Sequence, residues 1–424
     1  MRKNISLLLS GLVVAGGLVF IPGCLKDHVT EKYTIYTPVV SLKSDVLAHI
    51  NGSPAQTIAQ TGQIYVKGSY IYLNDVDKGI HIIDNSDPVH PVQTAFLNIP
   101  GNENIGIRNN ILYADMYADL LAIDISDVHQ PKLVGTLRNF FSSRGVGMDS
   151  NYIVSSWNVK DTSFSVKPTG FLFQIPNTTV YGYTGSYPAA YASLSSSAAA
   201  KSNTGTAGSN AVMVLSGDYL YAIPEEHTLG IVNVTDSTKP NSIVRFGAGY
   251  DLETIFLLQD KLLLGSKEGV YVYSVAEPYT PKSLGSFTHG TACDPVIANS
   301  KYAYVTLHTG TYCGGSANEL DILDAKDISN ATLIKTYPMT KPSGLCVDGT
   351  ILFVCDASVV KVYDVSAPDN IQLLSSIPVN NPNDVIAGNN LLLVVAADGL
   401  HEFDYTDPGS PKTLGVFAIT NSKS

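Results

Sequence analysis

Basic residues are scarce and scattered in this chain. Lys and Arg number 26 against 37 Asp and Glu, which gives the 424 residues a formal net charge of −11. Proteins bind nucleic acid and anionic lipid surfaces chiefly through clustered Lys and Arg. The charge balance therefore argues against a nucleic-acid partner, and solubility is the simplest interpretation of the acidic excess.

The short motifs of common enzyme classes are also missing. The sequence contains no HExxH, no G-x-S-x-G, no P-loop and no G-x-G-x-x-G. These absences do not exclude an enzyme, because some folds assemble a site from loops far apart in the sequence. They favour a non-enzymatic protein, and we predict no cofactor, with Ca²⁺ or Zn²⁺ as the only candidates.

What the sequence has in abundance is a repeated unit of about 40 residues. Its clearest copy, residues 62–100, contains four short runs rich in Ile, Val and Tyr that end at Gly, Asp, Asn or Pro, which is typical of strands joined by turns. We count eight units, of which the one beginning at Gly145 is weak and lacks a closing turn. Residues 62–420 are therefore predicted to form an all-β propeller of eight four-stranded blades, with seven as the alternative.

A short turn signal closes the third strand of several units. Asp84, Asp124, Asp364 and Asp404 are each followed two residues later by Ser or Thr. Asp and Ser side chains at such positions hydrogen-bond nearby backbone groups and favour turns. The aspartates are therefore predicted to hold the turn that leads to the outermost strand.

The N-terminus has the pattern of an export signal. Arg2 and Lys3 precede an apolar run over residues 5–21, and Cys24 follows a small residue. Ile-Pro-Gly-Cys resembles the lipobox of bacterial lipoproteins, with Cys24 as the acylated residue. We expect a signal peptide over residues 1–23 and a lipid-anchored leader over 24–61, in which residues 37–50 form a strand that closes the ring against the last blade.

Residues 160–209 interrupt the repeat and are predicted to be an insertion in the third blade. Much of this stretch is small, polar and of low complexity, and such sequence buries too little apolar area to offset its ordering entropy. Long insertions can carry binding residues, and they can equally be tolerated surface loops. Both interpretations stay open.

One stretch of the chain gathers several metal-type ligands: His289, Cys293, Asp294, His308, Tyr312 and Cys313. Two His, two Cys and an Asp would suit zinc. In an oxidising envelope the thiols pair more readily, so we favour a disulfide between Cys293 and Cys313. Cys346 and Cys355 are interpreted as small buried apolar residues.

Residues just before each innermost strand should point toward the mouth of the central channel. The candidates are Asn104, Arg144, Glu253, Asp294, Asn383 and Asp384. A ring of carboxylates and amides could hold a cation or a polar ligand. The alternative is that these side chains close turns and hydrogen-bond neighbouring blades. Trp157 is the single Trp, a candidate anchor at a binding surface or a core residue.

The repeated Ile-Ile-Asp-x-Ser and Pro pattern resembles the LVIVD-repeat family of bacterial and archaeal surface proteins. More narrowly, the chain is similar to lipoproteins of that family from Bacteroidetes. The residues that carry this resemblance are Cys24 to Asp27, the stretch YIYLNDVDKGIHIIDNSDP, LETIF at residues 252–256, and TACDPVIANSKYAYVTL with GTYCGG in residues 291–315. The resemblance implies a propeller and an envelope location, and it implies no activity.

Together these patterns favour a non-enzymatic scaffold, lipid-anchored in the outer membrane and exposed at the cell surface. We expect a monomer that binds a protein or a glycan through loops on one face and through the insertion. The alternative is a hydrolase or lyase that uses the carboxylates at the channel mouth, assisted by a metal.

The lipid anchor is open to a direct test. Cys24→Ala removes the thiol that would carry the acyl chains, so the protein should move from the membrane to the soluble fraction when cells are fractionated. Leu25→Ala keeps the thiol and should leave the protein in the membrane fraction. Retention of the Cys24→Ala protein on membranes would contradict lipid anchoring.

Overall fold

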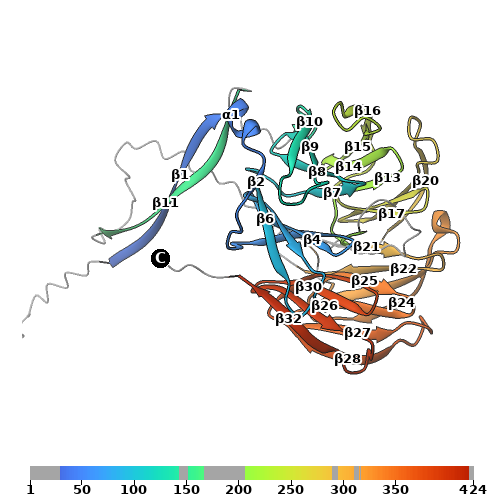
Figure 1. Cartoon of the computed structure of the whole chain (residues 1–424). Helices are drawn as coiled ribbons and strands as arrows, with labels where there is room; N and C mark the ends of the chain where they lie inside the picture. Colours follow the sequence, from blue (N-terminus) through green and yellow to red (C-terminus); the bar gives the residue numbers. More distant parts are fainter. Residues whose placement is uncertain are drawn as a thin grey trace, which may run out of the picture. The chain divides into compact units, whose positions relative to one another are not determined.

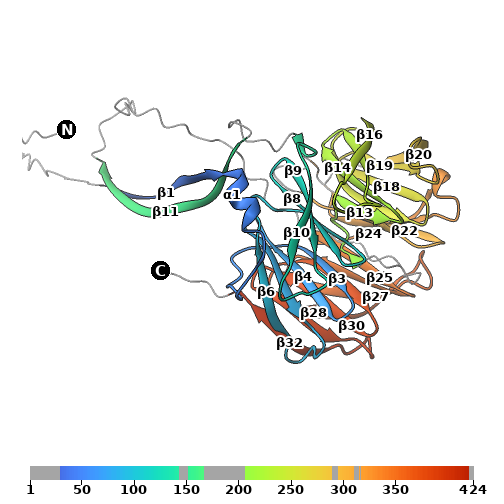
Figure 2. The same cartoon turned by 45° about the horizontal axis from the view of Figure 1, so that its top comes forward.

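The structure is a computed structural model that describes residues 29–142, 151–166, 206–288, 295–309, 315 and 317–419. The chain divides into two compact units, residues 1–37 with 157–184, and residues 38–156 with 185–424. The second unit contains seven sheets that follow one another around a ring (Figure 1). The view in Figure 2 shows the same order of blades from a second direction.

Each blade is built from four consecutive antiparallel strands. The first blade contains β3 (Thr61–Lys67), β4 (Tyr70–Asp75), β5 (Gly79–Asp84) and β6 (Val92–Asn98). The second contains β7 (Ile105–Arg108), β8 (Ile111–Met116), β9 (Asp119–Asp124) and β10 (Lys132–Leu137). The third contains β13 (Met213–Ser216), β14 (Tyr219–Glu225), β15 (Thr228–Asn233) and β16 (Asn241–Gly247).

The remaining four blades repeat this arrangement. The fourth contains β17 (Leu252–Leu258), β18 (Lys261–Ser266), β19 (Gly269–Ser274) and β20 (Lys282–Thr288). The fifth contains β21 (Val296–Ala298), β22 (Tyr302–Leu307), β23 (Glu319–Asp324) and β24 (Thr332–Pro338). The sixth contains β25 (Pro342–Asp348), β26 (Ile351–Asp356), β27 (Val359–Asp364) and β28 (Gln372–Pro378). The seventh contains β29 (Pro382–Gly388), β30 (Leu391–Ala396), β31 (Gly399–Asp404) and β32 (Lys412–Ala418).

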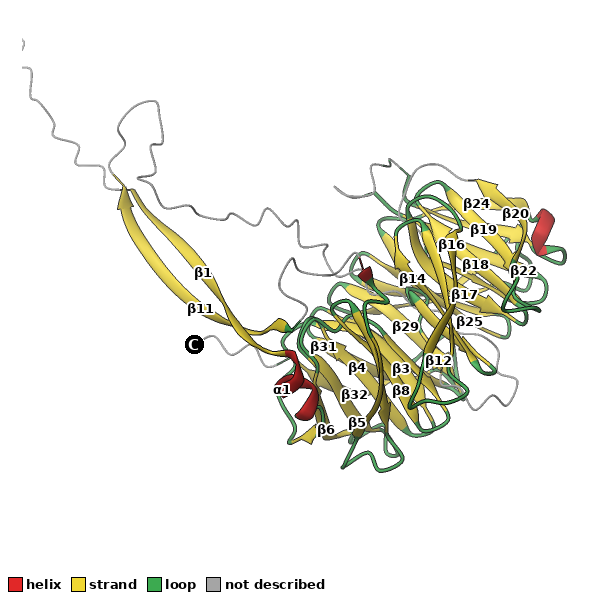
Figure 3. Cartoon of the chain, turned by 90° about the horizontal axis from the view of Figure 1, so that it is seen from above, coloured by secondary structure: helices red, strands yellow, loops and turns green. Residues whose placement is uncertain are grey.

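Helix is rare in the described part of the chain, as Figure 3 shows. It includes α1 (Lys43–Ala48) and a 3₁₀ turn, η2 (Ile328–Asn330). No helix among the described residues is both long and apolar enough to cross a membrane.

The prediction of eight blades is wrong, and the alternative of seven is correct. Among its described residues, the weak unit that begins at Gly145 supplies β11 (Tyr152–Val166), which pairs with β1 (Val29–Leu42) in a two-stranded sheet. Residues 152–166 form one continuous strand with no turn inside it, so this described stretch does not build a meander by itself. The partner of β11 comes from the leader, more than a hundred residues earlier.

The leader does not close the ring against the last blade. The strand expected within residues 37–50 is the end of β1 and is followed by α1. A further short strand, β2 (Gly52–Ser53), pairs with β6 at the outer edge of the first blade. The predicted insertion lies between the second and third blades, and its residues 167–205 lie outside the described part.

The predicted turns after the third strand are confirmed. The side-chain oxygens of Asp84, Asp124, Asp364 and Asp404 each accept the backbone N–H two residues later, at 2.8–2.9 Å. A second aspartate three residues further on repeats this arrangement in several blades, as Asp87 does with the N–H of Val89. The two successive turns direct the chain to the outermost strand.

Apolar side chains fill the interfaces between neighbouring blades. One cluster joins the sixth, seventh and first blades through residues such as Phe353, Val394 and Ile64. Cys346 and Cys355 are fully buried in this cluster, which confirms their interpretation as core residues. Because each blade is made of one continuous stretch, the first and last blades share no strand, and this packing closes the ring.

A buried hydrogen bond accompanies this closure. Glu402 of β31 is fully buried, and its Oε2 accepts from Nδ2 of Asn85 in the first blade at 2.8 Å. Its second carboxylate oxygen has no hydrogen-bond partner. Burial raises the pKa of Glu402 to about 7, and the bond from Asn85 lowers it only in part. The acid is therefore protonated in mildly acidic solution.

This raised pKa predicts how stability depends on pH. The folded protein holds a proton on Glu402 that the unfolded chain has already lost above its ordinary pKa of 4.5, so the free energy of unfolding should fall as pH rises from about 4.5 to 7. Glu402→Gln stays neutral and keeps an acceptor for Asn85. Urea unfolding should show the wild type losing on the order of 2–3 kcal/mol relative to the variant across this range. Parallel pH curves for the two proteins would contradict the assignment.

Candidate functional site

The turns that enter the innermost strands are held by buried carboxylates at the ends of the second strands. Asp75 accepts the backbone N–H groups of Ala59 and Gln60 at 2.9 and 3.0 Å. In the sixth blade, Asp356 occupies the equivalent position and accepts those of Thr340 and Lys341 at 3.0 and 2.6 Å. Each carboxylate fixes the two residues that lie just before an innermost strand.

A basic side chain accompanies each of these carboxylates. Nε2 of His81 lies 3.3 Å from Oδ2 of Asp75, and Nζ of Lys361 lies 2.6 Å from Oδ2 of Asp356. The two basic side chains occupy the same position in the third strand of their blades. For Asp356, burial opposes ionisation, but hydrogen bonds from Lys361 and from the entry turn lower its pKa. The turn therefore rests on an ionised carboxylate.

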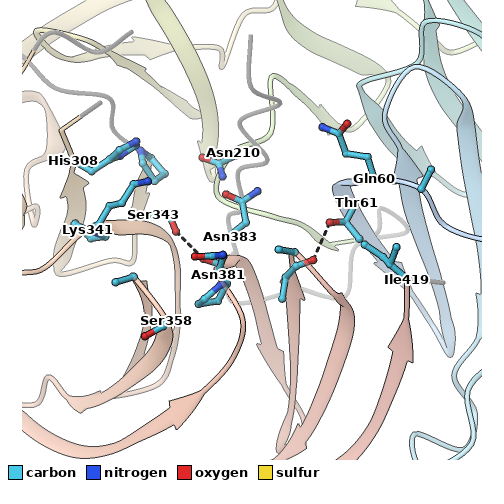
Figure 4. A pocket seen from close by; sticks show the side chains of 17 residues that line it. Gln60, Thr61, Asn210, His308, Lys341, Ser343, Ser358, Asn381, Asn383 and Ile419 are labelled. Carbon is cyan, nitrogen blue, oxygen red and sulfur yellow. Dashed lines mark hydrogen bonds between the residues drawn. The ribbon is translucent and has the colours of Figure 1, made fainter. Parts of the chain in front are cut away.

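A cavity of about 570 Å³ opens between these entry turns (Figure 4). Its polar lining comes from four blades and from the segment before the third blade. The lining side chains that can hydrogen-bond are Gln60, Thr61, Asn210, His308, Lys341, Ser343, Ser358, Asn381 and Asn383. Prolines, alanines and Ile419 complete the wall.

Hydrogen bonds between blades fix the position of several lining residues. Oγ of Ser343 in the sixth blade donates to the carbonyl of Pro382 in the seventh at 3.2 Å. Oγ1 of Thr61 in the first blade donates to the carbonyl of Ala396 at 3.1 Å. The dashed lines in Figure 4 mark these bonds. The wall of the cavity is therefore pre-formed from the rigid ends of strands.

The described side chains that line the cavity are neutral or basic. It offers amides, hydroxyls, the Lys341 ammonium and the His308 imidazole, and it contains no carboxylate. Among the residues that the structure describes, no group of three or more His, Cys, Asp or Glu is arranged to hold a metal ion. Amides and hydroxyls with one cation suit a ligand rich in hydroxyl groups that carries negative charge.

A short segment just before the third blade contacts the innermost strands of two other blades. We call residues 206–210 the central plug. Its first part, β12 (Thr206–Ala207), pairs with the inner edge of β3 in the first blade. Oγ of Ser209 accepts the N–H of Leu345 from the innermost strand of the sixth blade at 3.2 Å, and Ser209 is buried. The plug thus links the first and sixth blades.

The structure places two of the predicted site residues at the cavity. Asn383 and His308 both line it. Asp384, predicted beside Asn383, does not, because successive strand residues point to opposite sides. It is fully buried at the interface with the sixth blade, where a Cβ on Gly344 would lie 2.5 Å from its Oδ1. Burial holds the pKa of Asp384 well above its ordinary range.

Other predicted residues have structural positions or lie elsewhere. Nδ2 of Asn104 donates to Asp115 at 2.7 Å, and its Oδ1 accepts from Gln63, so this residue closes a buried turn. Glu253 lies in β17 and does not line the cavity. Trp157 lies exposed in β11, outside the propeller core. Outside the described residues lie Cys24, Arg144, His289, Cys293, Asp294, Tyr312 and Cys313.

Several residues that line the cavity were not predicted from the sequence, although the sequence contains a repeated pattern that marks them. Lys341-Pro342-Ser343 and Asn381-Pro382-Asn383 share the pattern of a polar residue, Pro and a second polar residue at the start of an innermost strand. Only the second of these was predicted as a binding candidate. Comparing equivalent positions between blades would have added Lys341 and Ser343.

The carboxylate at the end of the second strand should be essential for stability. Asp356→Ala leaves two backbone N–H groups of the entry turn and the Lys361 ammonium without their acceptor, so we expect a loss of about 2–4 kcal/mol in the free energy of unfolding. Asp364→Ala in the same blade removes one exposed turn bond and should cost about 1 kcal/mol or less. Urea unfolding of both variants measures the difference, and equal losses would contradict this role for Asp356.

Comparison with known proteins agrees with this fold. The family model described as LVIVD repeat matches residues 59–95 and 103–138, which cover the first and second blades. No curated protein matches the chain. The matches to solved structures are distant in sequence, and identities near 10% show the fold alone.

Three solved structures illustrate this likeness. A protein from Lactobacillus plantarum aligns with a TM-score of 0.52 and 10% identity over 85% of this chain and 98% of that chain. The periplasmic gluconolactonase PpgL from Pseudomonas aeruginosa aligns with a TM-score of 0.51 and 11% identity over 83% of this chain and 94% of that chain. The computationally designed Ika8 protein aligns with a TM-score of 0.51 and 11% identity over 86% of this chain and 92% of that chain. The chain therefore carries LVIVD repeats in its first two blades and folds as a β-propeller.

Proposed function

We propose that this protein is a non-enzymatic binding scaffold of the cell envelope whose propeller holds an acidic glycan in the cavity at the channel mouth. The observation that carries the proposal is the lining of the cavity. Amide and hydroxyl side chains match the hydroxyl groups of a sugar, and Lys341 with His308 would face its negative charge.

The size and the shape of the cavity support binding of a small unit of such a ligand. A volume of about 570 Å³ lies within the range of small-molecule sites. Asn210 of the central plug contributes to the lining, and contacts with the first and sixth blades hold the plug in place. A wall fixed by bonds between blades reduces the ordering that binding would require.

No specific observation favours the alternative of a hydrolase or lyase. The carboxylates expected at the mouth are absent from the described lining, and Asp384 is directed into a blade interface. The gluconolactonase among the similar structures shares the fold at 11% identity, which carries no inference about activity.

The envelope location rests on the N-terminal sequence. The apolar run before Cys24 and the resemblance to a lipobox support export and acylation. A lipid-anchored monomer would present the cavity to glycans or to proteins that carry them. A protein ligand remains the second class of partner within this proposal.

A binding measurement tests the proposal. Calorimetric titration with a uronic-acid oligosaccharide should show binding, and Lys341→Ala should weaken it about tenfold or more, because it removes a charge-assisted hydrogen bond. The matched control is Lys412→Ala on the outermost strand β32, which should bind as the wild type does. A neutral oligosaccharide of equal length should bind more weakly. No binding of either sugar, or equal effects of the two lysines, would contradict the proposal.

A further inference from the structure

The side chains that line the cavity are sorted by kind around the ring. The lining comes from blades five, six, seven and one, so the order of these blades sets the order of the lining residues. His308 follows β22 of the fifth blade, and Lys341 precedes β25 of the sixth. At the opposite side, Thr61 begins β3 of the first blade and Ile419 follows β32 of the seventh. Figure 4 shows the two pairs on opposite sides of the cavity.

The side of the cavity at the fifth and sixth blades is basic. Lys341 is exposed, and its ammonium forms no ion pair with any carboxylate in the described ranges. The imidazole of His308 lines the same side. A carboxylate of a ligand would accept a charge-assisted hydrogen bond here, which is roughly twice as strong as a neutral one. This side therefore suits the negative charge of a ligand.

Two carboxamides lie between the two sides (Figure 4). Asn210 is only 7% exposed, and Asn383 is partly buried in β29. Within the part of the chain that the structure describes, no group hydrogen-bonds the side-chain amide of either residue. A largely buried polar group is costly unless water or a ligand bonds it. Each carboxamide presents an acceptor and two donors, which the C=O and N–H of a second amide can satisfy.

The side of the cavity at the seventh and first blades is largely apolar. Ile419 packs against the cluster that joins the sixth, seventh and first blades, and it also lines the cavity. Ala59 and Ala397 are exposed in the turns next to it. The hydroxyl of Thr61 already donates to a backbone carbonyl at 3.1 Å, so Gln60 is left as the polar group of this side. An apolar group of a ligand, such as a methyl, would be removed from water here.

We propose that the cavity binds an acidic sugar that carries an N-acyl group. This inference rests on the proposed function and names the class of its ligand. The carboxylate of the sugar lies at Lys341 and His308. The amide of the acyl group bonds Asn210 and Asn383, and its methyl group covers Ile419. A plain uronic acid has no group for the apolar side, and a neutral N-acyl sugar has no charge for Lys341.

Pairs of sugars that differ in one group test this assignment. N-acetylneuraminic acid and its analogue with a hydroxyl in place of the acetamido group share the carboxylate and the carbon skeleton. Isothermal titration of the full chain with the methyl glycosides of both should show the N-acetyl sugar binding about tenfold more tightly. N-acetylmuramic acid should in turn bind about tenfold more tightly than N-acetylglucosamine, which lacks its carboxylate.

Variants locate each group of the sugar in the cavity. Asn383→Ala should lower the affinity for N-acetylneuraminic acid about tenfold and change that for the hydroxyl analogue less than about twofold. Lys341→Ala should weaken both sugars alike, because both carry the carboxylate. The matched control is Asn241→Ala, at an exposed position that begins the outermost strand β16, and it should leave both affinities unchanged. Ile419→Ala should also reduce the preference for the N-acetyl sugar, and Asn383→Ala tests the same preference without disturbing the core.

The outcomes separate this inference from the proposed function. Equal affinity for N-acetylneuraminic acid and its hydroxyl analogue would overturn the N-acyl assignment and leave an acidic glycan as the ligand. Equal weakening of both sugars by Asn383→Ala would overturn it as well, since the amide would then not recognise the acyl group. If neither these acids nor the uronic-acid oligosaccharide binds, the proposed function itself fails. Tighter binding of N-acetylneuraminic or of N-acetylmuramic acid supports the inference in either case and identifies the source of the ligand.

Discussion

The packing between the last blade and the first is the constraint on which the rest of this propeller depends. Every blade is one continuous stretch of chain, so no strand is shared across the closure. Side-chain contacts join the ends of the ring: the cluster that contains Ile64 and Val394, the bond from Thr61 to the carbonyl of Ala396, and the buried contact of Glu402 with Asn85. The cavity lies at this closure, so its shape depends on the same contacts.

The site is built from strand ends rather than from long loops. Asp75 and Asp356 hold the entry turns by hydrogen bonds to backbone groups, and the lining side chains follow directly from these turns. Such a wall is positioned by the sheets themselves, which makes it more rigid than a site carried on mobile segments. The same repeated framework can carry different side chains at equivalent positions in each blade, such as Lys341 and Asn381.

Local patterns in the sequence predicted the strands and turns. They did not predict which strands pair when the two strands lie far apart in the chain. In the turn at Asp84, the side chain bonds a backbone group only two residues away, so the local sequence is enough to predict this turn. The partner of β11 is β1, and nothing local to residues 152–166 indicates it, which led to the count of eight blades. At the candidate site, Asn383 lines the cavity and Asp384 does not, since candidates were chosen by position before the strand and not by the face to which each residue points.

The central plug sets an order for the assembly of the molecule. It follows the first two blades in the sequence and precedes the other five, yet Ser209 contacts Leu345, 136 residues later. Because Ser209 cannot reach its partner before the sixth blade exists, the contacts of the plug are completed only after most of the chain has folded. Contacts of this sequence separation form late and slowly.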